Sequence, residues 1–379
     1  MEKMGLVVGI DISKDAIRLA YWKNGMPGPE MLTDEEDKEC FWSRNTNDEL
    51  SEIIKNVVCD ALKRLGEAFD KVIFTMPDAI EPKFMTSLES LIEGLCPTTS
   101  EIRFISHSES SAHYSLNQKK ELRMNDVAFF DFSRAGLMYR RMHVANSGGK
   151  INALVGQKDC SGTVNMELLT SAEMKKMMDE NFKVLLGSLL DKQQISTVYL
   201  TGEGFENEDW AVESLNMLCK KRRVFKGGNL YAVGACYMGM KSFVSGLAPE
   251  YRVFCEGRTV YETCVEVILN GERSEAVLVP ASKLWYEADN TIEGYLSGAS
   301  KVVLTLRSYF GREVLREEIM LEELGANVSE RMARVQIKAT MPNTEELLIS
   351  ISNLGFGEFA PKSDTKVERI IKNDIFFAV

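Results

Sequence analysis

The chain has 379 residues, more than one hydrophobic core usually serves, so two or more domains are expected. Lysine and arginine number 45 against 56 aspartate and glutamate residues, and the net charge of −11 disfavours nucleic acid and acidic membrane surfaces as main partners. Eight scattered cysteines without a Cys-x-x-Cys pair, only three histidines and no apolar run of ~20 residues argue against a disulfide framework, a zinc site or a membrane helix, and favour a cytoplasmic protein with reduced thiols.

The first 125 residues predict alternating strands and helices. Gly5–Ile12 and Ala16–Trp22 are apolar runs joined by a tight turn, which predicts a β-hairpin with Asp11 near the end of its first strand. Residues 50–65 have apolar side chains at helical spacing, preceded by the capping box Thr46-x-x-Glu49. The elements expected next are a strand at 72–77, a helix at 84–95 and a strand at 102–105. This order predicts an α/β sheet with helices on its faces.

Three short sequences of this first part recur in the same order later in the chain. They are Asp11-Ile-Ser13-Lys14 with Asp131-Phe-Ser133-Arg134, Val72-Ile-Phe-Thr75 with Val198-Tyr-Leu-Thr201, and Ser111-Ala-His-Tyr114 with Gly234-Ala-Cys-Tyr237. A helix is expected between the first two recurrences, at residues 170–189, with a stripe of Met and Leu that indicates core packing. Three matches in one order predict two structurally equivalent lobes, residues 1–125 and 126–248.

After residue 248 the pattern changes to short strands. Asn270-Gly271 lies between two apolar runs and predicts a hairpin. Further strands are expected at 302–306, 335–339 and 347–351, and a single helix at Val314–Leu324. Residues 249–379 are therefore predicted to form a β-sandwich domain, with the boundary near Ser245–Pro249.

These segments together resemble the superfamily of actin, sugar kinases and DnaK-type chaperones. The resemblance covers residues 1–245 and is carried by two hairpin aspartates, a strand that ends in proline, an inter-lobe helix of small residues, an adenosine motif and the helix after it. In this sequence these are Asp11 and Asp131, Val72–Pro77, Ser106–Leu116, Thr201–Phe205 and Ala232–Ala235. The resemblance implies a duplicated, ribonuclease H-like α/β fold that holds ATP or ADP with Mg²⁺ between its two lobes.

The resemblance also implies site residues. The catalytic candidates are Asp11 and Asp131, which would also hold Mg²⁺. The phosphate-binding candidates are Asp11, Ser13, Lys14, Asp131, Ser133, Arg134 and Gly136. The adenosine-binding candidates are Gly202, Glu203, Gly204 and Phe205. Gly202 and Gly204 would let a base approach closely, or would simply allow the chain to turn from strand to helix.

The phosphate-binding turns depart from the pattern of the superfamily. Such turns bind phosphate because glycines bring backbone N–H groups close to its oxygens. Here the first turn, residues 12–15, has no glycine, and the second keeps Gly136 alone. Asp15 would in addition place a carboxylate near the phosphates, a like-charge contact that costs on the order of several kcal/mol in a partly dry cleft. This departure argues against ordinary ATP hydrolysis and leaves open whether the protein is an enzyme.

Lys14 and Arg134 occupy equivalent positions in the two repeats and have two interpretations. They replace the lost N–H donors and bind an anion between the lobes. Alternatively they pair with Asp15, Asp131 or Glu203 and close an empty cleft. Asp131 likewise either positions Mg²⁺ or an attacking water, or satisfies the backbone donors of its own turn.

Other conspicuous residues have simpler explanations. The run Lys220–Arg223 complements the carbonyl end of a helix rather than binding nucleic acid. His107 and His113 are interpreted as structural. The apolar positions of 367–377 are expected to pack onto the sandwich rather than to tether a membrane.

The expected function is regulatory or scaffolding, with weak or no nucleotide binding. The C-terminal third, particularly Asn353–Phe359, is also similar to a bacterial family of unknown function that adds such a β domain to an actin-like module. The β domain would bind a protein or peptide partner, and self-association into a homo-oligomer stays open. The alternatives are a chaperone-like ATPase whose β domain binds peptides, and a small-molecule kinase or phosphatase of the same superfamily.

Overall fold

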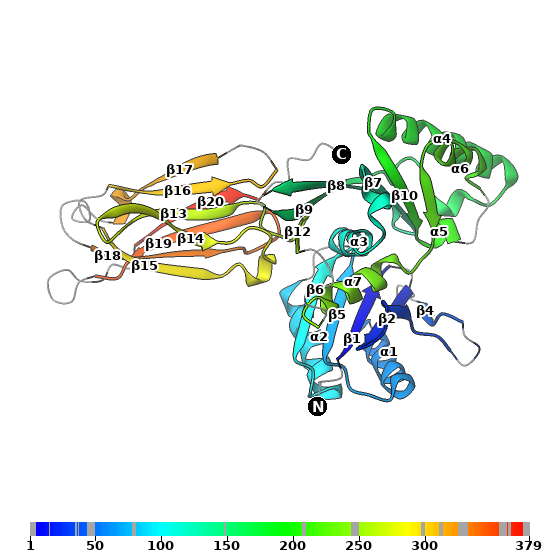
Figure 1. Cartoon of the computed structure of the whole chain (residues 1–379), viewed down its shortest axis with the longest axis horizontal. Coiled ribbons are helices and arrows are strands. Elements are labelled where there is room, and N and C mark those ends of the chain that lie inside the picture. The colour runs from blue at the N-terminus through cyan, green and yellow to red at the C-terminus, as the bar shows by residue number, and fades with distance from the viewer. Residues whose placement is uncertain are drawn as a thin grey trace. The chain divides into compact units, whose positions relative to one another are not determined.

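The computed structural model divides the chain into two compact units (Figure 1). The described part of the first runs over Gly5–Asn146 and Ala153–Tyr251, and that of the second over Arg252–Asn373 with the short segment Ser147–Asn152. The structure describes residues 5–14, 16–34, 36, 38–43, 50–77, 81–147, 149–206, 210–243, 250–296, 300–310, 314–324, 333–355, 362 and 365–373. The predicted capping box, Asp15, the boundary at 245–249, residues 356–359 and the apolar tail beyond 373 lie outside these ranges.

The first lobe of the first unit is built on one mixed sheet. Its strand order is β3-β2-β1-β5-β6, with β4 paired to β2. β1 is buried along its whole length, as its apolar sequence requires, and it pairs antiparallel with β2 and parallel with β5. The strands are β1 (Leu6–Ile12), β2 (Ala16–Lys23), β3 (Glu30–Met31), β4 (Phe41–Ser43), β5 (Lys71–Met76) and β6 (Glu101–Ser106), and the helices are α1 (Leu50–Leu65) and α2 (Pro82–Leu95).

The second lobe repeats this topology. Its sheet contains the order β9-β8-β7-β10-β11, with β12 added beside β9. Without β4 and β12, the strand order in both lobes is third, second, first, fourth, fifth along the chain. The strands are β7 (Asp126–Ser133), β8 (Gly136–Ser147), β9 (Lys150–Asp159), β10 (Ile195–Thr201) and β11 (Arg223–Lys226). The helices are α4 (Ala172–Leu190), α5 (Glu203–Glu206) and α6 (Val212–Cys219), with 3₁₀ turns η1 (Lys120–Arg123) and η2 (Met166–Leu168). The repeat in sequence thus corresponds to a repeat in strand order.

Two further helices, α3 (His107–Leu116) and α7 (Leu230–Met240), lie side by side between the lobes (Figure 1). α7 follows the last strand of the second lobe but packs on the first sheet, where Val7 and Trp22 share a cluster with its apolar side chains. A Cβ on Gly9 would lie 2.2 Å from the carbonyl oxygen of Ala232, and one on Gly234 would lie 2.1 Å from that of Ser110. Glycine at these positions therefore allows α7 to contact β1 and α3 directly.

The second unit consists of antiparallel strands. They form two four-stranded sheets, β14-β13-β16-β17 and β15-β18-β19-β20, and one hydrophobic cluster draws buried residues from both. The strands are β12 (Tyr251–Phe254), where the units divide, β13 (Glu262–Leu269), β14 (Glu272–Val279), β15 (Asn290–Leu296), β16 (Lys301–Arg307), β17 (Val314–Met320), β18 (Ala333–Thr340), β19 (Glu346–Asn353) and β20 (Lys366–Lys372), with 3₁₀ turns η3 (Trp285–Glu287) and η4 (Glu322–Leu324).

One prediction for this unit is confirmed and one is wrong. Asn270 and Gly271 have φ of 54° and 85°, and they join β13 to β14 as the expected hairpin. The helix expected at Val314–Leu324 is instead strand β17 followed by a 3₁₀ turn. Seven backbone pairings with β16 and the burial of Ile319 in the shared core outweigh the helix propensity of its Glu and Leu residues. Within the described ranges, no helix is long and apolar enough to cross a membrane.

Candidate functional site

The two hairpin aspartates hold equivalent positions in the two lobes. Asp11 lies on β1 opposite Thr75 of the parallel neighbour β5. Asp131 lies on β7 opposite Thr201 of the parallel neighbour β10. Each therefore stands near the carboxyl end of its lobe's first strand, beside the turn that the sequence marked for phosphate binding.

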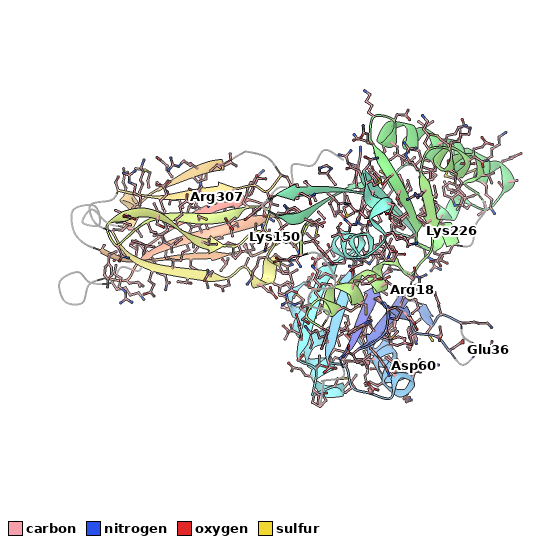
Figure 2. The ribbon with its side chains drawn as sticks, viewed as in Figure 1. Arg18, Glu36, Asp60, Lys150, Lys226 and Arg307 are labelled. Carbon is pink, nitrogen blue, oxygen red and sulfur yellow. The ribbon has the colours of Figure 1, made fainter. Side chains whose placement is uncertain are left out.

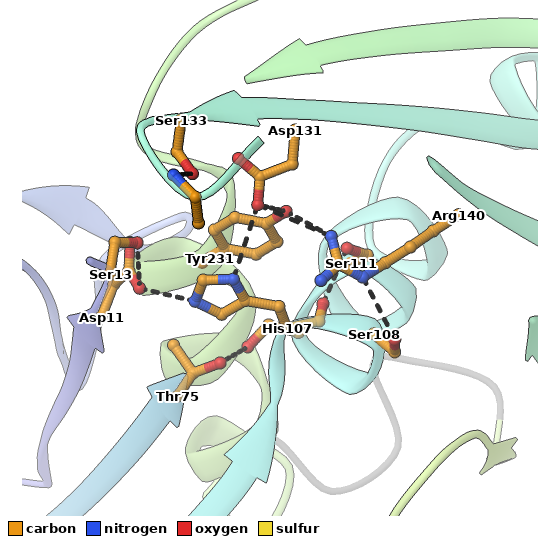
Figure 3. A network of polar contacts seen from close by, with 12 residues as sticks. Asp11, Ser13, Thr75, His107, Ser108, Ser111, Asp131, Ser133, Arg140 and Tyr231 are labelled. Atoms are coloured by element: carbon orange, nitrogen blue, oxygen red, sulfur yellow. Dashed lines mark hydrogen bonds and ion pairs between the residues drawn. The ribbon is translucent and has the colours of Figure 1, made fainter. Parts of the chain in front are cut away.

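A histidine lies between these two aspartates (Figure 3). His107 Nε2 is 2.8 Å from Asp11 Oδ1, a hydrogen bond, and His107 Nδ1 is 3.7 Å from Asp131 Oδ2, an ion-pair distance. His107 is the first residue of α3, placed there by the N-cap Ser106, and its side chain is only 1% exposed. Its ring stacks on that of Tyr231 with 3.6 Å between the centroids.

Asp131 has two further partners besides His107. The hydroxyl of Tyr231 donates to Asp131 Oδ2 at 2.8 Å, and Arg140 Nη1 is 3.6 Å from the same oxygen. Arg140, which is fully buried on β8, also donates from Nη1 to the Tyr231 hydroxyl and from Nε to Ser108 Oγ. The aspartate is therefore held by side chains of α3, α7 and β8 together.

The acidic and basic groups of this cluster shift one another's pKa values. Burial disfavours the imidazolium, but the charge and hydrogen bond of Asp11, together with Asp131, outweigh it and raise the pKa of His107 above 6.5. Burial likewise disfavours the carboxylate of Asp131, but its interaction with His107, the charge of Arg140 and the hydrogen bond from Tyr231 hold its pKa below the usual value. Burial raises the pKa of Tyr231 well above 10, so this hydroxyl stays protonated and donates. Two carboxylates and two cations thus balance in a buried site.

The serine side chains of the two turns form hydrogen bonds within their own hairpins. Ser13 Oγ donates to the carboxylate of Asp11 at 2.9 Å, and Ser133 Oγ accepts from the N–H of Ala135 at 3.2 Å. Gly136 has φ of 115°, and a Cβ there would lie 2.0 Å from Ser161 Oγ. The glycine is therefore required by its backbone and by packing, without any ligand.

The structure shows one of the acidic partners expected for the two predicted cations. Arg134 pairs with Glu203 at 3.6 Å, but both belong to the second lobe, so this pair cannot close the cleft. Lys14 lines the cavity between the lobes. Hydrogen bonds from Ser161, with a smaller contribution from the charge of Lys14, lower the pKa of Asp159. An ion pair that was not predicted joins the lobes: Arg18 of β2, labelled in Figure 2, binds Glu206 of α5 at 3.0 Å.

The predicted adenosine motif packs largely inside the second lobe. A Cβ on Gly202 would lie 2.4 Å from the carbonyl oxygen of Phe132, and one on Gly204 would lie 2.3 Å from the Phe132 ring. Phe205, an adenosine-binding candidate, is 3% exposed and packs in an aromatic cluster with Phe132 and Trp210. Both glycines have a packing reason inside the protein, and of the motif only Thr201, Gly202 and Glu203 line the cavity.

The cavity beside the aspartates is small. Its volume is about 180 Å³, and it is lined by side chains of both lobes that include Lys14, Arg18, His107, Asp131 and Ser133. Pockets for small molecules usually have about 300–1,000 Å³. Across the described part of the chain, no three His, Cys, Asp or Glu side chains are arranged to hold a metal ion. With His107 between its carboxylates, the site does not fit Mg²⁺ with a nucleoside triphosphate.

Two protein-family models match the chain. A model described as "Family of unknown function (DUF5716) C-terminal" matches residues 12–256. The chain belongs to this family. A second model, "Domain of unknown function (DUF8552)", matches residues 258–373. None of the curated proteins matches the chain.

Solved structures resemble this DUF5716 member in fold. They include a ROK hexokinase from Thermus thermophilus, with a TM-score of 0.40 and 11% identity over 62% of this chain and 100% of that chain. The ethanolamine utilization protein EutJ from Carboxydothermus hydrogenoformans has a TM-score of 0.40 and 13% identity over 61% and 89%. A ROK family glucokinase from Streptomyces griseus in complex with glucose and AMPPNP has a TM-score of 0.40 and 14% identity over 62% and 99%. The predicted similarity to a family of unknown function is confirmed by the two family models.

Sequence reasoning missed three residues of the site in this DUF5716 member. They are His107, Arg140 and Tyr231. His107 directly follows a strand and a helix-capping serine, and Arg140 directly follows the apolar run Leu137–Tyr139. A histidine or arginine in such a position is a signal of a paired, buried cation, because an unpaired one would cost several kcal/mol.

Proposed function

We propose that residues 5–243 form an actin-like module that works without a nucleotide cycle, in a regulatory or scaffolding protein. The observation that carries this proposal is that Asp11 and Asp131, the two aspartates expected to serve Mg²⁺, are already bound by His107, with Arg140 and Tyr231 on Asp131. A metal with a triphosphate would have to displace an internal cation that is hydrogen-bonded and buried.

The turns and the cavity support the same proposal. Ser13 and Ser133, the hydroxyl groups that would contact phosphate, bond within their own turns. The cavity of about 180 Å³ is small for a nucleoside triphosphate. We further propose that the second unit, interpreted as a β-sandwich, is the surface for a protein or peptide partner, and that the protein acts in the cytoplasm.

Calorimetry on the purified protein tests the absence of a nucleotide cycle. We expect no saturable heat with ATP or ADP at millimolar concentration, with or without Mg²⁺, and no release of phosphate. Saturable binding with turnover would contradict the proposal and favour an ATPase or a small-molecule kinase.

A set of variants tests which residues close the site to nucleotide. Replacing Lys14 and Arg134 by glycine restores backbone donors but leaves His107 on both aspartates, so we expect Lys14→Gly with Arg134→Gly to gain no affinity for Mg²⁺–ATP. Adding His107→Gly should give measurable binding, because the cation between the two carboxylates is then removed and Asp11 loses its bond to the ring. A gain in the double variant alone would show that the turn cations, rather than His107, exclude the nucleotide. The variant His143→Gly is the control for loss of a histidine.

A further inference from the structure

The buried cluster around His107 draws its members from both lobes. Asp11 on β1 and His107 on α3 come from the first lobe, and Asp131 on β7 and Arg140 on β8 come from the second. Each of these side chains is almost completely buried, with Asp131 the most exposed at 13%. Tyr231 of α7 joins the cluster from the helix that packs on the first sheet.

The geometry favours a cation at His107. Both ring nitrogens face a carboxylate, and an ionised carboxylate accepts hydrogen bonds but donates none. A neutral imidazole has a single N–H, so it would leave one nitrogen lone pair directed at a negative charge. A protonated ring also balances the site, since two carboxylates then oppose the two cations His107 and Arg140. The flat Tyr231 ring stacked on it favours a cation further.

We propose that the imidazolium of His107 is a built-in cation that takes the place of a bound metal–nucleotide complex and ties the two lobes together through Asp11 and Asp131. The inference rests on the proposed function, because it explains how the cleft stays closed without a ligand. His107 acts as a positioning residue rather than a catalytic one. The second tie between the lobes, Arg18 with Glu206, is more exposed, with side-chain exposures of 15% and 27%, and is therefore the weaker of the two.

Chemical rescue tests the tie directly. The variant His107→Gly leaves a space of the shape of an imidazole ring between two carboxylates, and we expect its melting temperature to fall by roughly 10 °C. Imidazole at tens of millimolar and about pH 6, where it is largely protonated, should restore most of this loss in a saturable way. Pyrazole has the same shape but stays neutral, and it should restore little.

The matched control is His143→Gly. His143 Nδ1 is 2.8 Å from Asp126 Oδ1, the same distance as in the His107 pair, but it is 46% exposed and both residues lie in the second lobe. Its loss should change the melting temperature by about 2 °C or less, without rescue by imidazole. A His107→Gly variant as stable as the parent, or one rescued equally by pyrazole, or not rescued at all, would overturn the proposal.

A second pair of variants decides the question even if His107→Gly does not fold. His107→Gln leaves the cluster with an excess negative charge, whereas His107→Gln with Asp11→Asn restores the balance. We expect the double variant to have the higher urea midpoint, and the reverse order would contradict a charge-based tie. Nucleotide calorimetry on the parent protein is a separate measurement, so failure of the proposed function and failure of the tie are distinguishable.

Discussion

At the scale of single residues, the ionisation of His107 makes stability depend on pH. Its folded pKa lies above the ordinary value of 6.5, so its contribution is fully present below that pH and is lost as pH rises through the raised folded pKa. Asp131, whose pKa is lowered, contributes stability that is lost at the acid end, as pH falls through its folded pKa.

A comparison with His107→Asn measures this dependence. Urea unfolding of both proteins from pH 5 to pH 9.5 should give a difference in the free energy of unfolding that is largest near pH 6 and shrinks toward alkaline pH. The reason is that the parent loses the imidazolium there, while asparagine has no charge to lose. A difference that stays constant or grows with pH would show that His107 is neutral in the folded protein.

At the scale of elements, the contact between α3 and α7 depends on Gly234. An added Cβ would lie 2.1 Å from the backbone oxygen of Ser110, and a backbone atom cannot turn away as a side chain can. We expect Gly234→Ala to lower the free energy of unfolding by roughly 3 kcal/mol, at the upper end of the cost of overpacking. Chemical denaturation measures it.

The control for this substitution is Gly94→Ala in α2. No atom lies within 4 Å of a Cβ built at Gly94, so the change should be neutral or stabilising by about 0.5–1 kcal/mol through helix propensity. If both alanine variants behaved alike, the close approach of α7 to α3 would not be needed for stability.

At the scale of the whole molecule, the chain has separate hydrophobic cores in its two units. Phe182 is fully buried in the cluster of the second lobe, and Ile349 is fully buried in the cluster shared by the two antiparallel sheets. We expect scanning calorimetry to show two transitions. Phe182→Ala should lower the temperature of one transition and Ile349→Ala that of the other. Each substitution should lower the free energy of unfolding of its own unit by about 3–5 kcal/mol. Two variants that shift a single common transition would show that the units unfold together.

The sequence by itself determined the parts of this protein that depend on local patterns. The spacing of apolar residues predicted the order of strands and helices. The similar short sequences around Asp11 and Asp131 indicated the repeat, because equivalent positions in a duplicated fold can keep similar residues. The Asn270-Gly271 turn could also be predicted from the sequence, because both of its central residues have positive φ angles and few residue types adopt them.

Only the tertiary structure decided what the aspartates do. His107 lies 96 residues from Asp11 in the chain, and no local pattern shows that the start of α3 meets the ends of β1 and β7. The burial of Phe205 also depends on distant contacts, because it packs against Phe132 and Trp210. Strand β17, within the segment predicted as a helix, forms because β16 pairs with it along its whole length. Contacts between distant segments determine the charge state and access of a site, and these contacts exist only once the chain has folded.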